Sequence, residues 1–360
     1  MLLQNKIYFG KKICSIMNRC FRSADFKAPA FSRCATRLSR SSQRVQASVY
    51  PVKSGQRSKQ CDNNKYTWKT DFGDFDISYR AHESGREESI LFVHGFGASI
   101  GHYRKIIDKF PEYNVYAIDL LGFGESSKPI VPYNMKIFRD QIRHFIAENI
   151  DTDKVHIVGN SIGSLAALMA AADSSSVKSL VLLNCAGGLN NKAIQEDWRV
   201  KLAMPLFLLI DLLLKNQQIG TWLFDKVRDR ENLRKILTPI YPKNPSAVDD
   251  ELIEMLHGPS NHPNAKDVFV EIITTNSAGP SPLQIIHDIS CPILLLWGTA
   301  DNLTPSDGPV GKFFQNIHEV RGDDSKFINL EGIGHCPMDE APEEVVREME
   351  LWLTKLRLQT

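Results

Sequence analysis

Cysteine is scarce in this 360-residue sequence: the seven that occur show no spacing typical of a disulfide framework or a zinc site. The sequence also has no dinucleotide-binding glycine fingerprint and no cluster of metal-ligating residues. No apolar stretch is long enough to span a bilayer. We therefore expect reduced thiols, no cofactor and no metal. Because 42% of the residues are hydrophobic, the chain can bury a sizeable core.

Acidic residues are almost absent from residues 1–60, which contain thirteen Lys or Arg and one acid, Asp25. The rest of the chain has 30 basic and 41 acidic residues, so no basic surface for nucleic acid is expected there. A basic, Ser-rich opening is typical of an organelle transit peptide, and Val45-Gln46-Ala47 resembles a stromal processing site. We expect residues 1–60 to be a disordered leader that directs the protein to the chloroplast. The alternative is a disordered basic tail without a targeting role.

Strand-like and helix-like segments alternate from Tyr66 onward, which predicts an α/β fold with a mainly parallel central sheet and helices on both faces. The predicted strands are short apolar or alternating runs at 75–79, 90–93, 115–118, 155–158, 180–183, 293–297 and 327–330. The main predicted helices of this part are 135–150, 162–172 and 342–356.

The alternation stops between Gly188 and Pro282, where every predicted element is a helix. These helices are expected at 198–215, 222–227, 231–237, 248–256 and 265–274. A helical block inside an alternating pattern predicts a cap inserted over the carboxyl edge of the sheet. We expect residues 61–187 and 283–360 to form the core domain and residues 188–282 to form the cap, or lid.

A G-x-S-x-G pattern is centred on Ser161, directly after the strand at 155–158 and directly before an Ala-rich helix. A tight strand-to-helix turn exposes the serine hydroxyl above the sheet, and Gly159 and Gly163 allow neighbouring elements to approach closely. The pattern in this context predicts that Ser161 is a nucleophile.

A serine hydroxyl needs a neighbouring base, and His335 is the best placed of the ten histidines. It lies in the loop between the last predicted strand and the closing helix. Asp301 follows the penultimate strand and is expected to orient the imidazole, so the residues have the chain order Ser, Asp, His. Two alternatives stay open: Asp119 competes as the acid, and Asp301 can instead cap the turn before Pro305.

The segment His94-Gly95-Phe96-Gly97-Ala98-Ser99 follows the strand at 90–93. Acyl transfer passes through a tetrahedral oxyanion, which needs preorganised hydrogen-bond donors. The backbone N–H groups of Phe96 and Ile162 are the candidate donors of this oxyanion hole. We expect His94 to support the loop by hydrogen bonding rather than to act as a base.

These four elements resemble the α/β-hydrolase superfamily over roughly residues 66–356, which implies the α/β-hydrolase fold and a triad of Ser161, Asp301 and His335. The similarity to plastid chlorophyll dephytylases and the related pheophytinases is closer still. It lies in His94–Ile100, Gly159–Ser164, Leu183–Gly188, Asn191–Leu214 and Asp307–Lys312. This resemblance implies a serine esterase of chlorophyll catabolism in the stroma or at the thylakoid surface. Its substrate would be the phytyl ester of chlorophyll or a chlorophyll derivative.

The predicted cap contains an apolar run, residues 202–214, that is too short to span a bilayer. Within it, Leu206, Leu209 and Ile210 are the candidate contacts for the substrate. The run is compatible with a tunnel for a long isoprenoid chain or with peripheral contact to a thylakoid membrane. The alternative is that it packs the cap onto the core.

Two further functions stay open on the residues alone. The same triad serves a hydrolase or an acyltransferase that acts on another lipophilic ester. A ligand-sensing module can also retain such a pocket and bind a partner without turnover. A serine at the elbow, rather than an aspartate, argues against dehalogenase or epoxide hydrolase chemistry.

Overall fold

The computed structural model describes residues 64–172, 174–189, 211–275, 277 and 279–359. All of these belong to the compact unit that spans residues 61–360. None of the described helices is both long and apolar enough to cross a membrane.

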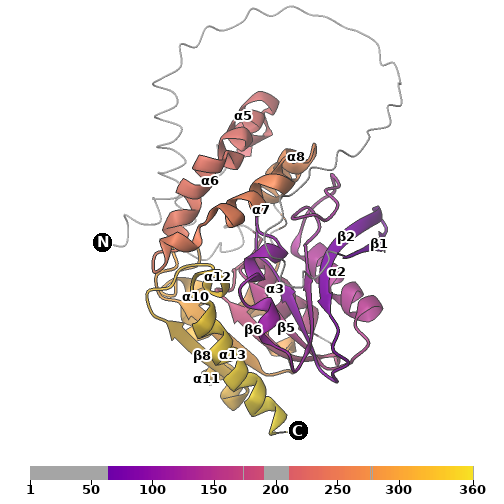
Figure 1. Ribbon diagram of the computed structural model, residues 1–360, viewed down its shortest axis with the longest axis vertical. Coiled ribbons are helices and arrows are strands. Elements are labelled where there is room, and N and C mark those ends of the chain that lie inside the picture. The colour runs from indigo at the N-terminus through magenta and orange to yellow at the C-terminus, as the bar shows by residue number, and fades with distance from the viewer. Residues whose placement is uncertain (1–63, 173, 190–210, 276, 278, 360) are drawn as a thin grey trace, which may run out of the picture. The chain divides into compact units, whose positions relative to one another are not determined.

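An eight-stranded sheet forms the centre of this unit, with the strand order β1-β2-β4-β3-β5-β6-β7-β8 (Figure 1). β1 pairs antiparallel with β2, and β2 antiparallel with β4, whereas all the other neighbouring pairs are parallel. The strands are β1 (Asn64–Thr70), β2 (Gly73–His82), β3 (Ser89–Val93), β4 (Asn114–Ile118), β5 (Val155–Asn160), β6 (Val177–Leu183), β7 (Ile293–Gly298) and β8 (Ser325–Leu330). The predicted α/β class with a mainly parallel sheet is therefore confirmed.

Each of the seven predicted strands overlaps an observed strand, and the observed strands are longer by one to five residues. β1 was not predicted. It lies at the edge of the sheet, where Trp68 is its one buried residue. A strand that is mostly exposed needs little apolar alternation, so its sequence gives a weak signal.

Two hydrophobic clusters cover the two faces of the sheet, because successive side chains of a strand point to opposite faces. In β7, for example, Leu295 belongs to one cluster and Leu294 to the other. Residues of α2 (Met135–Asn149), α3 (Ile162–Ala171) and α10 (Pro309–Gln315) join the first cluster. Residues of η1 (Ile100–Tyr103), η2 (Ile107–Lys109), α12 (Pro337–Glu340) and α13 (Pro342–Arg357) join the second. The predicted helices on both faces are thus present.

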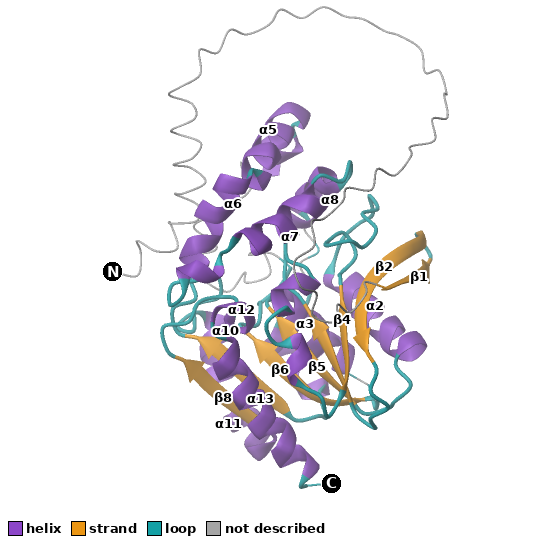
Figure 2. Cartoon of the chain, viewed as in Figure 1, coloured by secondary structure: helices purple, strands orange, loops and turns teal. Residues whose placement is uncertain are grey.

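Helices α5 to α8 follow β6 in the chain and precede β7, and they gather together in space (Figure 2). They are α5 (Gln217–Arg228), α6 (Arg230–Leu237), α7 (Asp250–Ser260) and α8 (Ala265–Thr274), with the short turns η4 (Thr238–Ile240) and η5 (Pro245–Ala247) between α6 and α7. Of the predicted helix at 198–215, only residues 211–215 lie in the described part, and these are helical. The remaining short elements are α9 (Pro282–Ile285), η6 (Ile286–Asp288), α11 (His318–Arg321) and η7 (Gly322–Asp324).

Candidate active site

Ser161 lies at a sharp turn between the last residue of β5, Asn160, and the first residue of α3, Ile162. Its backbone has φ 56° and ψ −120°, and it is one of two described non-glycine residues with a positive φ. Such a backbone conformation is strained and persists when the surroundings enforce it. Here the backbone N–H of Ser161 donates to Leu183 O at 3.0 Å, and Ser161 O accepts from Ala186 N at 3.1 Å.

Glycine is required at both elbow positions, Gly159 and Gly163, because backbone atoms of neighbouring residues lie very close to them. A Cβ atom on Gly163 would lie 2.4 Å from the carbonyl oxygens of both Val93 and His94. A Cβ on Gly159 would lie 2.5 Å from the Cα of Ser164. The start of α3 is thereby pressed against the end of β3, as the G-x-S-x-G pattern predicts.

Asp301 and His335 meet at the carboxyl ends of β7 and β8. The Oδ2 atom of Asp301 lies 2.7 Å from Nδ1 of His335, and both residues are buried. Nδ1 therefore carries a proton that it donates to the carboxylate, which leaves Nε2 free to accept a proton. The Asp301–His335 pair thus leaves Nε2 of His335 available to act as a general base.

Further donors surround the carboxylate of Asp301. Oδ2 also accepts from Asn184 Nδ2 at 2.6 Å and from Thr304 Oγ1 at 2.5 Å, while Oδ1 accepts from the backbone N–H of Leu303 at 2.7 Å. Burial opposes the negative charge, but the neighbouring His335 and these hydrogen bonds outweigh it, and the pKa of Asp301 lies below its usual value. Asp301 is therefore ionised and can offset a positive charge on His335.

The backbone on both sides of His335 is held by distant parts of the chain. The N–H of His335 donates to Ile240 O at 3.1 Å, and its carbonyl oxygen accepts from Asn160 Nδ2 at 3.0 Å. One residue earlier, the N–H of Gly334 donates to Oε2 of Glu340 at 2.6 Å. Through its other oxygen, Glu340 accepts from the N–H of Lys243 at 2.7 Å. The His335 loop is thus fixed between the elbow and the segment that follows α6.

The described structure places no hydrogen bond between the Ser161 hydroxyl and His335. Asn160 connects them instead, since it precedes Ser161 and its side chain binds the His335 carbonyl. Nucleophile–base contacts are often long in the absence of substrate. The three predicted residues are therefore brought to one edge of the sheet, with the Asp–His contact formed and the Ser–His contact open.

The candidate oxyanion donors lie beside Ser161. A Cβ on Gly95 would lie 3.0 Å from Cβ of Ser161, so the backbone that leads into Phe96 touches the elbow. In the part of the chain that the structure describes, no acceptor is bound to the backbone N–H of Phe96 or of Ile162. An oxyanion requires free backbone donors of this kind, and the role of these two N–H groups stays a prediction.

His94 supports this loop, as expected. Its Nδ1 lies 2.7 Å from Gly95 O and its Nε2 accepts from the N–H of Leu120 at 2.9 Å. Burial lowers the pKa of His94 to about 4. A buried imidazole with both nitrogens engaged is neutral and is not available as a base.

Asp119, the competing acid, makes no contact with His335 in the described structure. Its carboxylate accepts from the N–H of Ile100 at 2.8 Å and from the N–H of Glu125 at 2.9 Å. Burial raises its pKa to about 6. Asp119 thus organises the loop after β4.

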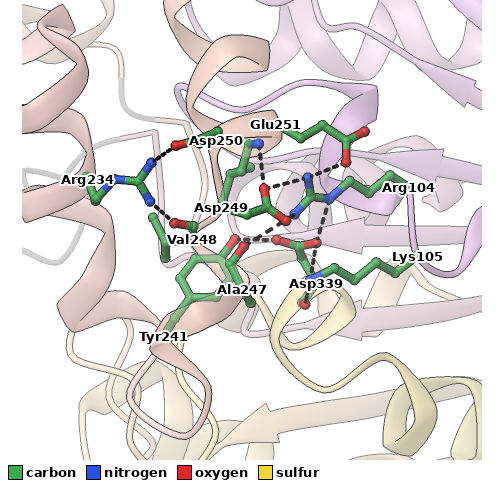
Figure 3. A network of polar contacts seen from close by, with 11 residues as sticks. Arg104, Lys105, Arg234, Tyr241, Ala247, Val248, Asp249, Asp250, Glu251 and Asp339 are labelled. Atoms are coloured by element: carbon green, nitrogen blue, oxygen red, sulfur yellow. Dashed lines mark hydrogen bonds and ion pairs between the residues drawn. The ribbon is translucent and has the colours of Figure 1, made fainter. Parts of the chain in front are cut away.

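A partly buried arginine, Arg104, joins the core to the helices between β6 and β7 (Figure 3). Arg104, at the end of η1, donates from Nη1 and Nη2 to the two carboxylate oxygens of Asp249, both at 2.9 Å. Its Nε donates to Asp339 in α12 at 3.1 Å, and Nη1 also reaches Glu251 at 3.0 Å. Because a bidentate arginine–carboxylate pair is geometrically specific, it fixes the start of α7 over the carboxyl edge of the sheet.

The predicted substrate contacts Leu206, Leu209 and Ile210 lie outside the described residues. Their role stays a prediction.

A family model described as the alpha/beta hydrolase family matches residues 90–348. This match spans most of the chain, from β3 to α13, and includes the elbow, Asp301 and His335. The chain belongs to the α/β-hydrolase family.

This α/β-hydrolase is similar to Lipase 1 of Psychrobacter immobilis, with 25% identity over 76% of this chain and 78% of the lipase. It is 26% identical to the chloroplastic pheophytinase of Arabidopsis thaliana over 74% of this chain, and the match spans 61% of that enzyme's length. Among solved structures, a bacterial membrane phospholipase A superposes with a TM-score of 0.60 at 24% identity. That superposition covers 82% of this chain and 87% of the phospholipase. Lipase- and esterase-type relatives thus support a hydrolase, and a bacterial lipase is as similar as pheophytinase.

Three residues that shape the site of this hydrolase were not predicted from the sequence: Asn184, Thr304 and Glu340. Asn184, just after β6, has a positive φ of 48°. Asparagine tolerates this conformation, but no local sequence pattern predicts it here. Thr304 had a usable signal, because a Thr three residues after an Asp can close a turn on that carboxylate. Glu340 lies on a short helix with ordinary composition, and only its tertiary contacts distinguish it.

Proposed function

We propose that this α/β-hydrolase cleaves a lipophilic carboxylic ester through an acyl-enzyme on Ser161. The observation that supports it most is the Asp301–His335 contact of 2.7 Å beside the strained Ser161 elbow. Such an arrangement supplies an oriented base at a serine, which the hydroxyl alone lacks.

In this proposal, Oγ of Ser161 attacks the ester carbonyl carbon while Nε2 of His335 takes its proton. The N–H groups of Phe96 and Ile162 bind the oxyanion, and the bond to the leaving oxygen then breaks. His335 returns the proton to the departing alcohol. Water repeats the sequence on the acyl-enzyme, releases the carboxylic acid and restores Ser161. Asp301 stabilises the imidazolium in both halves.

The specific substrate that we propose is the phytyl ester of chlorophyll or of a chlorophyll derivative. The similarity to a chloroplastic pheophytinase and the basic, acid-poor leader support this choice. The similarity to a bacterial lipase favours a broader class, other lipophilic esters, as the second candidate.

The test incubates the protein and its Ser161→Ala variant with chlorophyll a, pheophytin a and p-nitrophenyl butyrate. Phytol release from either pigment by the wild type, and its loss in Ser161→Ala, is expected. Turnover of the aryl ester without phytol release would assign the broader class. Full retention of turnover in Ser161→Ala would contradict the nucleophile.

We also propose that residues 1–60 direct the protein to the chloroplast, where the hydrolase would act in the stroma or at the thylakoid surface. A fusion of residues 1–60 to a fluorescent protein, expressed in leaf protoplasts, is expected to enter plastids. Diffuse fluorescence throughout the cell would contradict the targeting role. Co-flotation of the mature protein with vesicles of thylakoid lipids tests membrane contact separately.

A further inference from the structure

Four phenylalanine rings form a continuous row that includes Phe96 of the candidate oxyanion hole. The ring of Phe96 packs against Phe123 with the centroids 5.5 Å apart, and against Phe269 at 5.7 Å. Phe269 in turn packs against Phe224 at 5.4 Å. Phe96 and Phe123 come from the loops after β3 and β4, whereas Phe269 and Phe224 come from helices α8 and α5.

The exposure of the rings differs along this aromatic row. The end members, Phe123 and Phe224, are 8% and 9% exposed. The central pair, Phe96 and Phe269, remains partly exposed. The row therefore presents ring surface in its middle, at Phe269 and at Phe96, whose backbone N–H is a candidate oxyanion donor.

Contacts between helix α8 and the core hold Phe269 against Phe96. Val268, 1% exposed, packs on Gly122, where a Cβ would lie only 2.7 Å from Cγ1 of Val268. At the start of the helix, Nδ2 of Asn264 donates to Lys128 O at 2.9 Å. Both contacts join α8 to the loop after β4, so the position of Phe269 against Phe96 is set by packing.

We propose that Phe96 and Phe269 form the subsite for the hydrocarbon chain of the ester, with Phe269 as the specificity-determining residue. The inference rests on the proposed function, because Phe96 is also a proposed oxyanion donor. Phenyl rings offer large apolar area with few rotatable bonds, so they bind a hydrocarbon chain at a small entropic cost. A chain that leaves the carbonyl meets Phe96 first and then Phe269, whose ring is supported by packing against Phe224.

The test compares kcat/KM for esters with a long or a short hydrocarbon chain, placed either in the acyl part or in the alcohol part. One pair is p-nitrophenyl octanoate and acetate, and the other is octyl acetate and ethyl acetate. In Phe269→Ala, the long-to-short ratio is expected to fall about tenfold in at least one pair, the scale typical of lost apolar pocket contacts. In Phe269→Leu, which keeps apolar bulk at this position, the long-to-short ratio is expected to fall less. Phe313→Ala is the matched control, because Phe313 is a half-buried phenylalanine of α10 that packs on Phe314.

A direct titration with 2-decanone, which has a carbonyl but no leaving group, tests the subsite without turnover. Its Kd is expected to rise about tenfold in Phe269→Ala relative to wild type. An unchanged ratio in both ester pairs together with an unchanged Kd would overturn the subsite. Equal losses for long and short esters would overturn it too, since they indicate that Phe269 only supports the oxyanion loop. Turnover that survives Ser161→Ala would defeat the proposed function, while the ketone titration still decides the subsite.

Discussion

One oxygen of Asp301 lies 2.7 Å from Nδ1 of His335, while the other accepts hydrogen bonds from the backbone N–H groups of Leu303 and Thr304. Orientation of the imidazole and capping of the turn, two roles that look like alternatives in the sequence, are thus performed by one carboxylate. A loss of stability on mutation therefore does not distinguish them, and the rate has to be measured.

We expect Asp301→Asn to lower the rate of acylation on the order of 10⁴-fold, as in comparable triads. It should also lower the free energy of unfolding by about 1–3 kcal/mol, because the amide N–H₂ group then faces other donors. Asp119→Asn is the matched control, since Asp119 also caps backbone N–H groups in a buried site. Single-turnover acylation and urea unfolding of both variants give the comparison. A slow Asp119→Asn beside a fast Asp301→Asn would reassign the acid.

We expect Glu340→Gln to lower kcat about 10- to 100-fold with little change in KM. Glu340 uses both oxygens, one for Gly334 and one for Lys243, and an amide can accept on one side only. Small displacements of a catalytic base reduce the rate strongly. The measurement is kcat and KM across pH, with the melting midpoint. Glu350→Gln, on an exposed face of α13, is the control. A variant that melts earlier but keeps the wild-type kcat would show that Glu340 is structural only.

Stability should decrease when the pH falls below about 6.5. Burial lowers the pKa of His102 and of His94 from 6.5 to about 4. The unfolded chain therefore binds more protons than the folded chain between these values, so the stabilisation is complete above pH 6.5 and is lost as the pH falls toward 4. Each such histidine contributes a slope of about 1.4 kcal/mol per pH unit. Asp119, with a pKa raised to about 6, works in the opposite direction.

The contribution of His102 can be isolated with His102→Gln, whose amide can still accept the N–H of Ser99. The difference in unfolding free energy between wild type and this variant should shift by about 3 kcal/mol between pH 7 and pH 4. Urea unfolding at one-unit pH steps gives the slope. Parallel curves for the two proteins would contradict the lowered pKa.

Gly163→Ala should prevent folding or lower the free energy of unfolding by several kcal/mol. Its Cβ would lie 2.4 Å from two backbone carbonyl oxygens, which cannot move away without opening the sheet. Gly258→Ala in α7 is the control, because nothing lies within 4 Å of the added Cβ. That change should stabilise the protein by about 0.5–1 kcal/mol, as alanine is the better helix former. Circular dichroism melts of the two variants test the contrast.

Seven of the eight strands, the elbow and the order of the candidate triad could be predicted from the sequence. These features are local: an apolar run, a G-x-S-x-G pattern and a histidine after the last strand each lie within a few residues. Parallel strands deliver their following loops to one edge of the sheet, so Ser161, Asp301 and His335 could be expected to meet there. The edge strand β1 could not be predicted from an apolar pattern because it is mostly exposed and needs none.

The groups that hold this site in shape are brought together by the fold and could not be predicted from the sequence. Asn184 is 117 residues from Asp301 in the chain, and the Lys243 backbone that Glu340 binds is 97 residues away. Phe269 meets Phe96 only because α8 packs on Gly122. Such pairings depend on packing and hydrogen-bond geometry between distant elements, and no periodicity or short motif encodes them. Asparagine, glutamate and phenylalanine at these positions have ordinary local contexts, so their roles emerge when the fold brings their partners together.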